Sequence, residues 1–486
     1  MLSSARAVRP DHVAVAHIGM TVSFAELESA AGRLADAAAL RPGERVAIVA
    51  SNVPALVVGM FASWQAGAVA VPLSARLRRF ELARAFADAE PAVAVSVPAQ
   101  AGFEVAQEIE ALEPVTPTLR ARVVLSELGE IVHVSHAVAR EAASLSPPDL
   151  AAILYTSGTT GEPKGALVPH RLADAMAENL GDLLGSYAEA PYGLAVPASH
   201  AFGLGCLLAG MAAAATAVLG DVTTSVEPLV RALDRHHAAV LHGTPPLLRR
   251  LLRAGAPITF RTGFVAGSLC PPEVLQELDQ RRAVVLNLYG MTEIGAAVSC
   301  RAEDPPEIRH TTVGRALPGY ELRVDTPEPG APGEIQVRSS YLPSGYHGRP
   351  WGDDELIDGD WFRTGDLGEL DAGGNLTIAG RAKEVIHVGG FNVFPAEVEA
   401  FLLTHPSIAQ AVVIGVPHPA LGEAPQAFVV PVDGATLEPR EVTSFARAGI
   451  AGYKVPYTVR VVEELPVLPS GKTDRRALAA PEEVVR

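Results

Sequence analysis

The sequence follows two hydrophobic patterns from its N-terminus to about residue 360. Short runs of β-branched and small apolar residues end in Gly or in polar turn residues, and stretches with helical spacing separate them. Strands that alternate with helices predict an α/β fold on largely parallel sheets, in which ligands bind beyond the carboxyl ends of the strands. The runs are ERVAIVAS (44–51), AVAVPL (68–73), AAILYTS (151–157), HHAAVLHGTP (236–245), TFRTGFVAG (259–267) and RAVVLNLYG (282–290).

The first long helical stretch has a distinct start signal. Ser23 stands directly before the apolar periodic segment, and Glu26 follows three residues later. This is the spacing of a capping box, in which two side chains satisfy the first backbone N–H groups of a helix. We therefore expect a helix to begin after Ser23.

The pattern changes over residues 313–379, where short alternating stretches are bounded by Gly and Pro. They predict a small antiparallel, barrel-like subdomain, and DAGG at 371–374 marks a hairpin turn within it. The last hundred or so residues combine a helix that begins near Pro395 with further strands, which predicts an α+β domain. The predicted domains are a core of residues 1–380 that includes the subdomain, a hinge at 381–385 and a C-terminal domain of residues 386–486.

Two apolar stretches, residues 53–73 and 207–220, have some membrane character. Ser63, Gln65 and Pro72 interrupt the first, and the second is too short to span a bilayer. Both are better explained as helices and strands buried in the core of an α/β fold.

Composition narrows the function classes. The chain has 486 residues, is 48% hydrophobic and carries a formal charge of −16 without a block of Lys and Arg. These properties predict a folded multidomain protein without a nucleic-acid or membrane partner. Three scattered cysteines without metal-ligand spacing indicate a reducing compartment, and the N-terminus lacks the apolar region of a secretory signal. We predict a cytoplasmic location.

The stretch YTSGTTGEPKG (155–165) has the residue types of a phosphate-binding loop. Its glycines allow the backbone to approach an anion, its hydroxyl groups add donors, and its lysine adds positive charge. The spacing is not the GxxxxGK[ST] of the mononucleotide P-loop, because Pro163 precedes the lysine and Gly165 follows it. Alone, the stretch is also compatible with a flexible surface loop.

A second stretch, PSGKTDRR (469–476), contains GKT but fails the same test. The position five residues before Gly471 should be glycine and is Pro466, and no complete βαβ unit precedes the stretch. A generic P-loop ATPase is therefore excluded. Alone, the stretch is compatible with a solvated basic turn.

Three further blocks accompany these two stretches: YGMTE (289–293), WFRTGD (361–366) and GRAKEVIHVGGFNVFPAEVE (380–399). Taken in their order along the chain, the five blocks resemble the adenylate-forming superfamily of acyl-CoA synthetases, peptide-synthetase adenylation domains and luciferase-like enzymes. The chain is closest in style to AMP-forming acyl- or aryl-CoA ligases, and the resemblance covers nearly its whole length.

The resemblance implies a fold and a reaction. The fold is α/β, with a large N-terminal part of two α/β sheets plus a small β-barrel and a small mobile α+β C-terminal domain. In the reaction, a carboxylate attacks the α-phosphate of ATP in the presence of Mg²⁺, which gives an acyl-adenylate and pyrophosphate. A second nucleophile, usually the thiol of CoA, then displaces AMP.

The resemblance also implies which residues bind ATP, residue by residue. A carboxylate suits the ribose because it accepts two hydrogen bonds. The implied residues are Thr156, Ser157, Gly158, Thr159, Thr160, Gly161 and Lys164 for the β- and γ-phosphates, Gly267, Ser268, Tyr289 and Gly290 for adenine, Asp366 for the ribose, and Arg381 for the ribose and phosphate.

The implied catalytic residues act on the reacting phosphate. Glu293 helps to hold Mg²⁺, an ion that prefers oxygen ligands, and Thr292 contacts the α-phosphate. Lys472 bridges the carboxylate and the α-phosphate and neutralises charge in the transition state. Lys383 stands at the hinge, and it can be a solvated surface charge at the same time. The C-terminal domain rotates about this hinge to present first Lys472 and then the loop at 389–390.

The acid pocket follows from SHAFGLG (199–205), VLHGTPPLL (240–248) and FVAGS (264–268). Amino-acid-activating relatives carry an aspartate where this chain has Ala201, so an α-amino acid substrate is disfavoured. The small apolar lining favours an aryl or medium acyl group. His200 lies near the carboxylate or the acceptor channel, or is structural, and His242 serves polar recognition or packing. The expected pocket residues are His200, Ala201, His242, Gly243 and Ala266.

Three functions share these motifs. The leading hypothesis is an acid–CoA ligase. A close alternative transfers the adenylated acid to an amine, as an amide synthetase does, or to a separate carrier protein. A third is a catalytically silent homologue that acts as a binding module, which the presence of all the charged motif residues disfavours.

Overall fold

The computed structural model describes most of the chain. Its contacts form two compact units, Met1–Glu321 with Arg338–Asp360 and Leu322–Val337 with Trp361–Arg486. The side chains of Thr156, Ser157, Pro163, Phe391 and Asn392 lie outside the description. The described residues are 9–100, 102–136, 145–157, 163–220, 225–326, 332–343, 345–351, 357–388, 391–419, 421–468 and 473–479.

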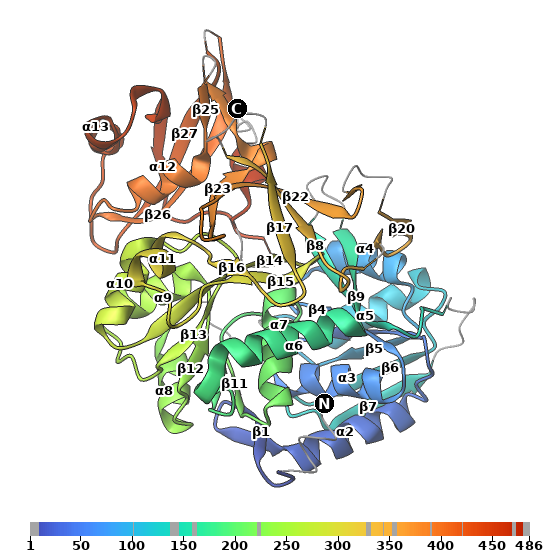
Figure 1. The fold of residues 1–486 in the computed structure, drawn as a ribbon. Helices are drawn as coiled ribbons and strands as arrows, with labels where there is room; N and C mark the ends of the chain where they lie inside the picture. The colour runs from blue at the N-terminus through green and yellow to red at the C-terminus, as the bar shows by residue number, and fades with distance from the viewer. Residues whose placement is uncertain are drawn as a thin grey trace. The chain divides into compact units, whose positions relative to one another are not determined.

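One sheet of the first unit has the strand order β20-β19-β9-β8-β4-β3-β5-β6-β7 (Figure 1). Strands β3, β4, β5, β6 and β8 run parallel, whereas β7, β9, β19 and β20 pair antiparallel. The central strands β3 and β4 are buried along their whole length and, apart from Arg45, are apolar, because both faces of the sheet are covered. Its strands are β3 (Arg45–Val49), β4 (Val69–Leu73), β5 (Val93–Ser96), β6 (Ala121–Leu125), β7 (Ile131–His136), β8 (Leu150–Ser157), β9 (Pro163–Pro169), β19 (Gly345–Tyr346) and β20 (Arg349–Pro350).

The other sheet of this unit has the order β16-β15-β14-β13-β12-β10-β11-β1-β2. Its middle, from β14 to β1, is parallel, and antiparallel pairs lie at both ends. Its strands are β1 (Val13–His17), β2 (Met20–Ser23), β10 (Tyr192–Leu194), β11 (Ala217–Leu219), β12 (Val240–His242), β13 (Thr262–Val265), β14 (Val284–Met291), β15 (Gly295–Ser299) and β16 (Arg315–Ala316).

The helices of this unit cover the two sheets, and α6 and α7 pack side by side between them (Figure 1). The predicted capping box is confirmed, because the Ser23 and Glu26 side chains both bond to the backbone at the start of α2. The helices are α2 (Phe24–Ala37), α3 (Pro54–Gln65), α4 (Arg79–Ala89), α5 (Val105–Leu112), α6 (His170–Leu184), α7 (Ala201–Ala212), α8 (Glu227–Arg235), α9 (Pro245–Arg253), α10 (Pro272–Gln280) and α11 (Pro306–Thr311).

The apolar stretches with membrane character are elements of this core, as predicted. The first forms α3 and β4, and the second forms the C-terminal half of α7 together with β11, all of them largely buried. No helix in the part of the chain that the structure describes has the length and apolarity needed to span a bilayer.

The second unit holds two smaller sheets. One contains β17, β18, β22 and β23, with the predicted hairpin turn at Asp371, and the other has the order β25-β24-β27-β26 with β28 beside β27. The elements are β17 (Glu321–Asp325), β18 (Gly333–Arg338), β22 (Trp361–Leu370), β23 (Leu376–Arg381), β24 (Ile386–Val388), β25 (Phe391–Val393), α12 (Pro395–Leu402), β26 (Ile408–His418), β27 (Gly422–Pro431), α13 (Pro439–Gly449), β28 (Thr458–Val461) and α14 (Arg475–Ala479).

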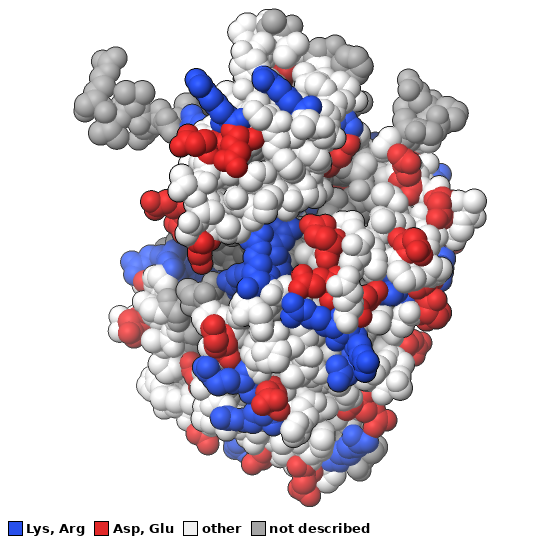
Figure 2. All heavy atoms as spheres, turned by 90° about the vertical axis from the view of Figure 1, so that its left-hand side faces the viewer, with Lys and Arg blue, Asp and Glu red and all other residues white. Residues whose placement is uncertain are grey.

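The contacts group the antiparallel sheet of β17, β18, β22 and β23 with the C-terminal elements. The sequence pattern predicts this sheet as part of the N-terminal core, so the boundary near residue 380 and the hinge at 381–385 stay predictions. The mixed α/β class with a separate C-terminal set of strands and helices is confirmed. On the face drawn in Figure 2, small groups of basic and acidic side chains are interspersed.

Candidate active site

The predicted phosphate loop connects the antiparallel strands β8 and β9. Thr156 lies opposite Lys164 in this hairpin, so both ends of the loop are placed. Lys164 stands in β9, with its Nζ 4.9 Å from the centroid of the Tyr346 ring. The tip of the loop, with Gly158, Thr159, Thr160 and Gly161, lies outside the described residues.

The hairpin is anchored next to the loop. The Tyr155 hydroxyl donates a hydrogen bond to the Asp88 carboxylate on α4 at 2.6 Å, and burial raises the pKa of this tyrosine. The His347 N–H donates to the Gly165 carbonyl at 2.7 Å. A Cβ on Gly165 would lie 2.8 Å from the Ile153 Cγ2, so glycine permits this close packing. The two strands that flank the loop are thus fixed by these contacts.

Strand β14 carries the YGMTE block to the carboxyl edge of its sheet. A Cβ on Gly290 would lie 2.0 Å from the Gly295 carbonyl oxygen, so only glycine fits the turn into β15. Glu293 follows in this turn, and its side chain is buried. The Tyr346 hydroxyl donates to the Glu293 Oε1 at 2.7 Å. The metal-binding carboxylate predicted from the sequence is therefore held by a residue that the sequence analysis did not name.

The predicted adenine residues lie at or just after the ends of two neighbouring strands. Strand β13 pairs in parallel with β14, with Val265 opposite Asn287. Gly267 and Ser268 follow the end of β13, and Gly267 adopts a positive φ of 93°. Because parallel strands end at the same edge, this loop and the Tyr289 turn lie on the same edge of the sheet.

The predicted acid-pocket residues follow the next strands of this sheet. His242 ends β12, Gly243 pairs with Val265, and Ala201 begins α7 directly after His200. Ala201 and Ala266 are largely buried. Strands β10, β12 and β13 are parallel neighbours, so these residues share the carboxyl edge with the adenine loop.

His242 is a neutral imidazole. Its side chain is buried, which lowers its pKa to about 3, and its ring stacks on Phe264 with the centroids 5.2 Å apart. Its Nδ1 accepts the backbone N–H of Phe264 at 3.3 Å. An acceptor nitrogen carries no proton, so the proton of the neutral ring sits on Nε2.

The second unit places the predicted ribose residues in contact. Asp366 in β22 lies opposite Arg381 in β23, with the Arg381 Nε 3.1 Å from the Asp366 Oδ1. Arg363, in the same block, forms hydrogen bonds to Glu334. Lys383 is exposed in the short 3₁₀ helix Ala382–Glu384. Lys472 and residues 389–390 lie outside the described residues.

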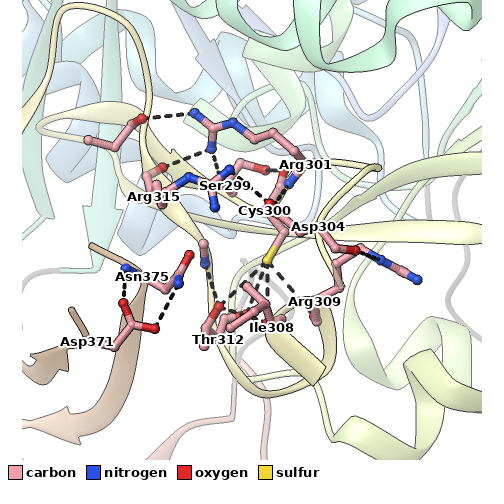
Figure 3. Close-up of polar contacts among 12 residues, drawn as sticks. Ser299, Cys300, Arg301, Asp304, Ile308, Arg309, Thr312, Arg315, Asp371 and Asn375 are labelled. Carbon is pink, nitrogen blue, oxygen red and sulfur yellow. Dashed lines mark hydrogen bonds and ion pairs between the residues drawn. The ribbon is translucent and has the colours of Figure 1, made fainter. Parts of the chain in front are cut away.

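A buried polar network, which the sequence analysis did not predict, supports β14. The Asn287 side chain donates to the carbonyls of Arg309 and Thr312, both at 3.0 Å, and the Ser299 hydroxyl donates to the Asn287 carbonyl at 2.9 Å. The Cys300 thiol lies 3.4 Å from the same Thr312 carbonyl, and burial raises its pKa to about 11 (Figure 3). An asparagine in the apolar run VVLNLYG was the one sequence signal for this network.

The same segment is tied to α10 by charge. Arg309 makes two hydrogen bonds to Asp279, at 2.7 and 3.0 Å, and His310 adds a third at 2.8 Å. Burial raises the pKa of Asp279, but these bonds outweigh that effect and the net pKa is lowered. The network fixes the segment that supports the YGMTE strand.

The donor set fits magnesium. The described residues contain no group of three His, Cys, Asp or Glu side chains that could enclose a metal ion. Mg²⁺ is commonly held by one or two carboxylates together with substrate phosphates, which matches a single buried carboxylate such as Glu293.

Comparison with known proteins identifies the family. The model of the AMP-binding enzyme matches residues 2–347, and the model of the AMP-binding enzyme C-terminal domain matches residues 397–472. The chain belongs to the AMP-binding enzyme family. As an AMP-binding enzyme it has the adenylate-forming fold, and its enzyme class is that of an AMP-forming acid–CoA ligase.

Individual relatives of this AMP-binding enzyme align with it over nearly the whole chain. It is 32% identical to a feruloyl-CoA synthase of Amycolatopsis sp over 95% of its own length and 94% of that protein. It matches o-succinylbenzoate CoA synthetase from Bacillus subtilis in complex with the acyl-adenylate intermediate, with TM-score 0.85, 28% identity and 99% and 98% coverage. The amide bond synthetase from Marinactinospora thermotolerans matches with TM-score 0.81, 27% identity and 98% and 99% coverage.

Proposed function

We propose that this AMP-binding enzyme activates an aryl or medium acyl carboxylic acid with ATP and transfers the acyl group to CoA. In the first step, a carboxylate oxygen forms a bond to the α-phosphorus of ATP while the bond to the pyrophosphate oxygen breaks. In the second step, the CoA thiolate bonds to the acyl carbon and AMP leaves. The first step needs charge neutralisation around the phosphates, and the second needs an entry path for the thiol.

One observation carries the proposal. Lys164 of the phosphate hairpin lies over the ring of Tyr346. Glu293 of the YGMTE turn accepts a hydrogen bond from the hydroxyl of the same tyrosine. A cationic loop for the β- and γ-phosphates and a carboxylate for their Mg²⁺ must approach the same triphosphate, and this contact brings them to the same place. We assign the α-phosphate contact to Thr292, which directly precedes Glu293 in the sequence.

The residues proposed to bind the adenine of ATP lie at the carboxyl edge of the sheet. Gly267 and Ser268 lie after β13, and Tyr289 and Gly290 lie at the end of its neighbour β14. We assign the adenine to this edge, the ribose to Asp366 and Arg381, and the bridging charge of the first step to Lys472. Lys383 is the proposed hinge.

The acid class follows from the pocket strands. An α-ammonium needs a carboxylate partner when buried, and Ala201 stands where amino-acid-activating relatives carry one. His242 is neutral and its Nε2–H is a donor, which suits an acid with an oxygen acceptor on its ring or chain. The named relatives act on aromatic acids, feruloyl and o-succinylbenzoate, which supports an aryl group.

The acceptor has a second candidate. The likeness to an amide bond synthetase favours an amine as an alternative to CoA, and a separate carrier protein remains a third acceptor class. CoA is preferred because the relatives named for their acids are CoA ligases. We propose a cytoplasmic location, since the three cysteines of the chain are free and buried.

A panel of carboxylic acids tests the proposal. Pyrophosphate release is measured with ATP and Mg²⁺ for aryl, medium acyl and amino acids, each with CoA, with simple amines or without an acceptor. We expect acid-dependent release that is strongest for aryl acids and CoA-dependent formation of a thioester. Acyl transfer to amines but not to CoA would mean that the acceptor is an amine. If no acid causes pyrophosphate release, the protein is a catalytically silent homologue.

A further inference from the structure

Tyr346 lies between the two halves of the proposed phosphate site. It stands in the two-residue strand β19, which pairs antiparallel with β9, so that Tyr346 is opposite Ala166. Its side chain is largely buried, with 8% of its surface exposed. Ala166 is two residues after Lys164, so this pairing places the phenol ring beside the base of the phosphate loop.

The two ends of the Tyr346 side chain make different contacts. The ring supports the Lys164 ammonium, whose Nζ is 4.9 Å from the ring centroid, within the range of a cation–π interaction. The hydroxyl donates to the Glu293 Oε1 at 2.7 Å, a length typical of a strong bond to a carboxylate. Glu293 lies 53 positions away in the sequence. One side chain thus contacts both charged groups.

Glu293 depends on this contact for its orientation. Its side chain is 6% exposed, and among the described residues Tyr346 is the hydrogen-bond donor to its carboxylate. A buried carboxylate without a donor is costly and free to rotate. The bond to Oε1 leaves Oε2 as the oxygen available to a metal ion.

We propose that Tyr346 is a positioning residue that holds Glu293 for the Mg²⁺ of ATP and keeps Lys164 at the phosphate loop. The proposal rests on the proposed function, because it needs a metal–nucleotide complex at this site. Partners that orient metal ligands typically account for a 10- to 100-fold difference in metal affinity.

A phenol suits this position better than a charged residue. A lysine or arginine bonded to Glu293 would neutralise the carboxylate and weaken its attraction for Mg²⁺. A neutral hydroxyl orients the carboxylate and leaves its charge in place. The aromatic face also stabilises the Lys164 ammonium by a cation–π interaction, without an ion pair with Glu293.

The test compares two tyrosines of the same neighbourhood. Tyr346→Phe keeps the ring beneath Lys164 and removes only the hydroxyl. Tyr320→Phe is the matched control, because the Tyr320 side chain is also buried and its hydroxyl donates to the Ile294 carbonyl at 2.8 Å, in the same turn as Glu293. Each variant loses one buried phenolic hydrogen bond, but only the first contact involves the carboxylate.

Two measurements are made on the full-length protein. The affinity for Mn²⁺ is measured by electron paramagnetic resonance in the presence of α,β-methylene-ATP, without acid, and pyrophosphate release is measured against free Mg²⁺. For Tyr346→Phe we expect about a tenfold weaker Mn²⁺ affinity and about a tenfold higher half-saturating Mg²⁺ concentration, with turnover restored at high Mg²⁺. Tyr320→Phe should keep the wild-type metal dependence.

The outcomes separate this inference from the proposed function. If the wild type is active but Tyr346→Phe has wild-type metal affinity, or Tyr320→Phe shifts it equally, Tyr346 has no specific positioning role. If the wild type binds neither the metal nor the nucleotide analogue and releases no pyrophosphate with any acid, the proposed function itself is wrong.

Discussion

Asp366 and Arg381 face each other across the β22–β23 pair, and the Arg381 Nε lies 3.1 Å from the Asp366 Oδ1. The Asp366 side chain is buried, whereas 47% of the Arg381 side chain is exposed. The backbone N–H of Asp366 also bonds to the Thr364 hydroxyl at 3.1 Å. The carboxylate is therefore oriented by a fixed register, as a group proposed to accept two ribose hydroxyls must be.

Asp366→Asn should weaken ATP binding without changing the affinity for the acid. The amide has one acceptor oxygen in place of two charged ones, and hydrogen bonds to charged groups contribute about 1.5–3 kcal/mol. We expect the KM for ATP to rise roughly ten- to a hundredfold in pyrophosphate-release kinetics.

The control for Asp366 lies on the same hairpin. Asp371→Asn alters a carboxylate that accepts the backbone N–H groups of Gly373 and Asn375, both at 2.8 Å. This variant should be less stable but keep the wild-type KM for ATP. Equal KM values for Asp366→Asn and the wild type would remove the ribose role.

Lys472→Ala should separate the two half-reactions. The lysine is proposed to neutralise charge only while the acyl-adenylate forms, so its loss should slow pyrophosphate release by roughly a hundredfold or more. Thioester formation from supplied acyl-adenylate should continue at nearly the wild-type rate. Lys454, which pairs with Glu397 within the C-terminal elements, provides the control variant Lys454→Ala. An equal loss in both halves would contradict the domain rotation.

Local signals explain which parts of the fold could be predicted. Ser23 and Glu26 are three residues apart and cap α2 as expected, and Pro395 begins α12. The apolar runs that end in Gly or in turn residues form strands β3, β4, β8, β12, β13 and β14, because burial on both faces selects such runs. These features depend on spacing within one segment, which the sequence displays directly.

The parts that were missed depend on contacts between distant segments. Tyr346 meets Glu293 across 53 positions, and Asn287 bonds to the Arg309 carbonyl across 22. Neither pair has a characteristic spacing, because the fold and not the local sequence brings the partners together. Motifs could name the acidic and basic groups of the site, but the neutral residues that orient them become visible only in three dimensions.

Arg309→Leu should destabilise the first unit. Arg309 is buried and makes two bonds to Asp279, so its removal leaves the carboxylate with His310 alone. Breaking a buried pair on one side costs about 3–5 kcal/mol. We expect a clearly lower urea midpoint for the unfolding of this unit, followed by fluorescence.

Two further variants test whether the loss in Arg309→Leu comes from the broken ion pair. Arg309→Leu combined with Asp279→Leu should recover part of the loss, since no charge is then left buried without its partner. Arg79→Leu breaks the surface pair with Glu108 and should shift the midpoint little. A double variant no more stable than Arg309→Leu alone would contradict the ion-pair explanation.

His242→Phe should change how stability depends on pH. The pKa of His242 is lowered to about 3 by burial, from an ordinary value near 6.5. Between these values the unfolded chain binds a proton that the folded protein does not, so the neutral ring costs stability as pH falls. The cost is about 2 kcal/mol near pH 5. The variant has no such proton and should lose less stability between pH 7 and pH 5.

Urea unfolding of the wild type and the variant near both pH values checks this expectation. Near pH 7 the variant should be less stable by about 1–3 kcal/mol, because the Phe264 N–H loses its acceptor. Near pH 5 the free energies of unfolding of the two proteins should converge, since only the wild type is destabilised by keeping the His242 ring neutral. His133→Gln, at an exposed position on β7, should keep the wild-type pH dependence. Parallel pH profiles for the wild type and His242→Phe would mean that His242 takes up its proton equally in the folded and unfolded protein, so that burial does not lower its pKa.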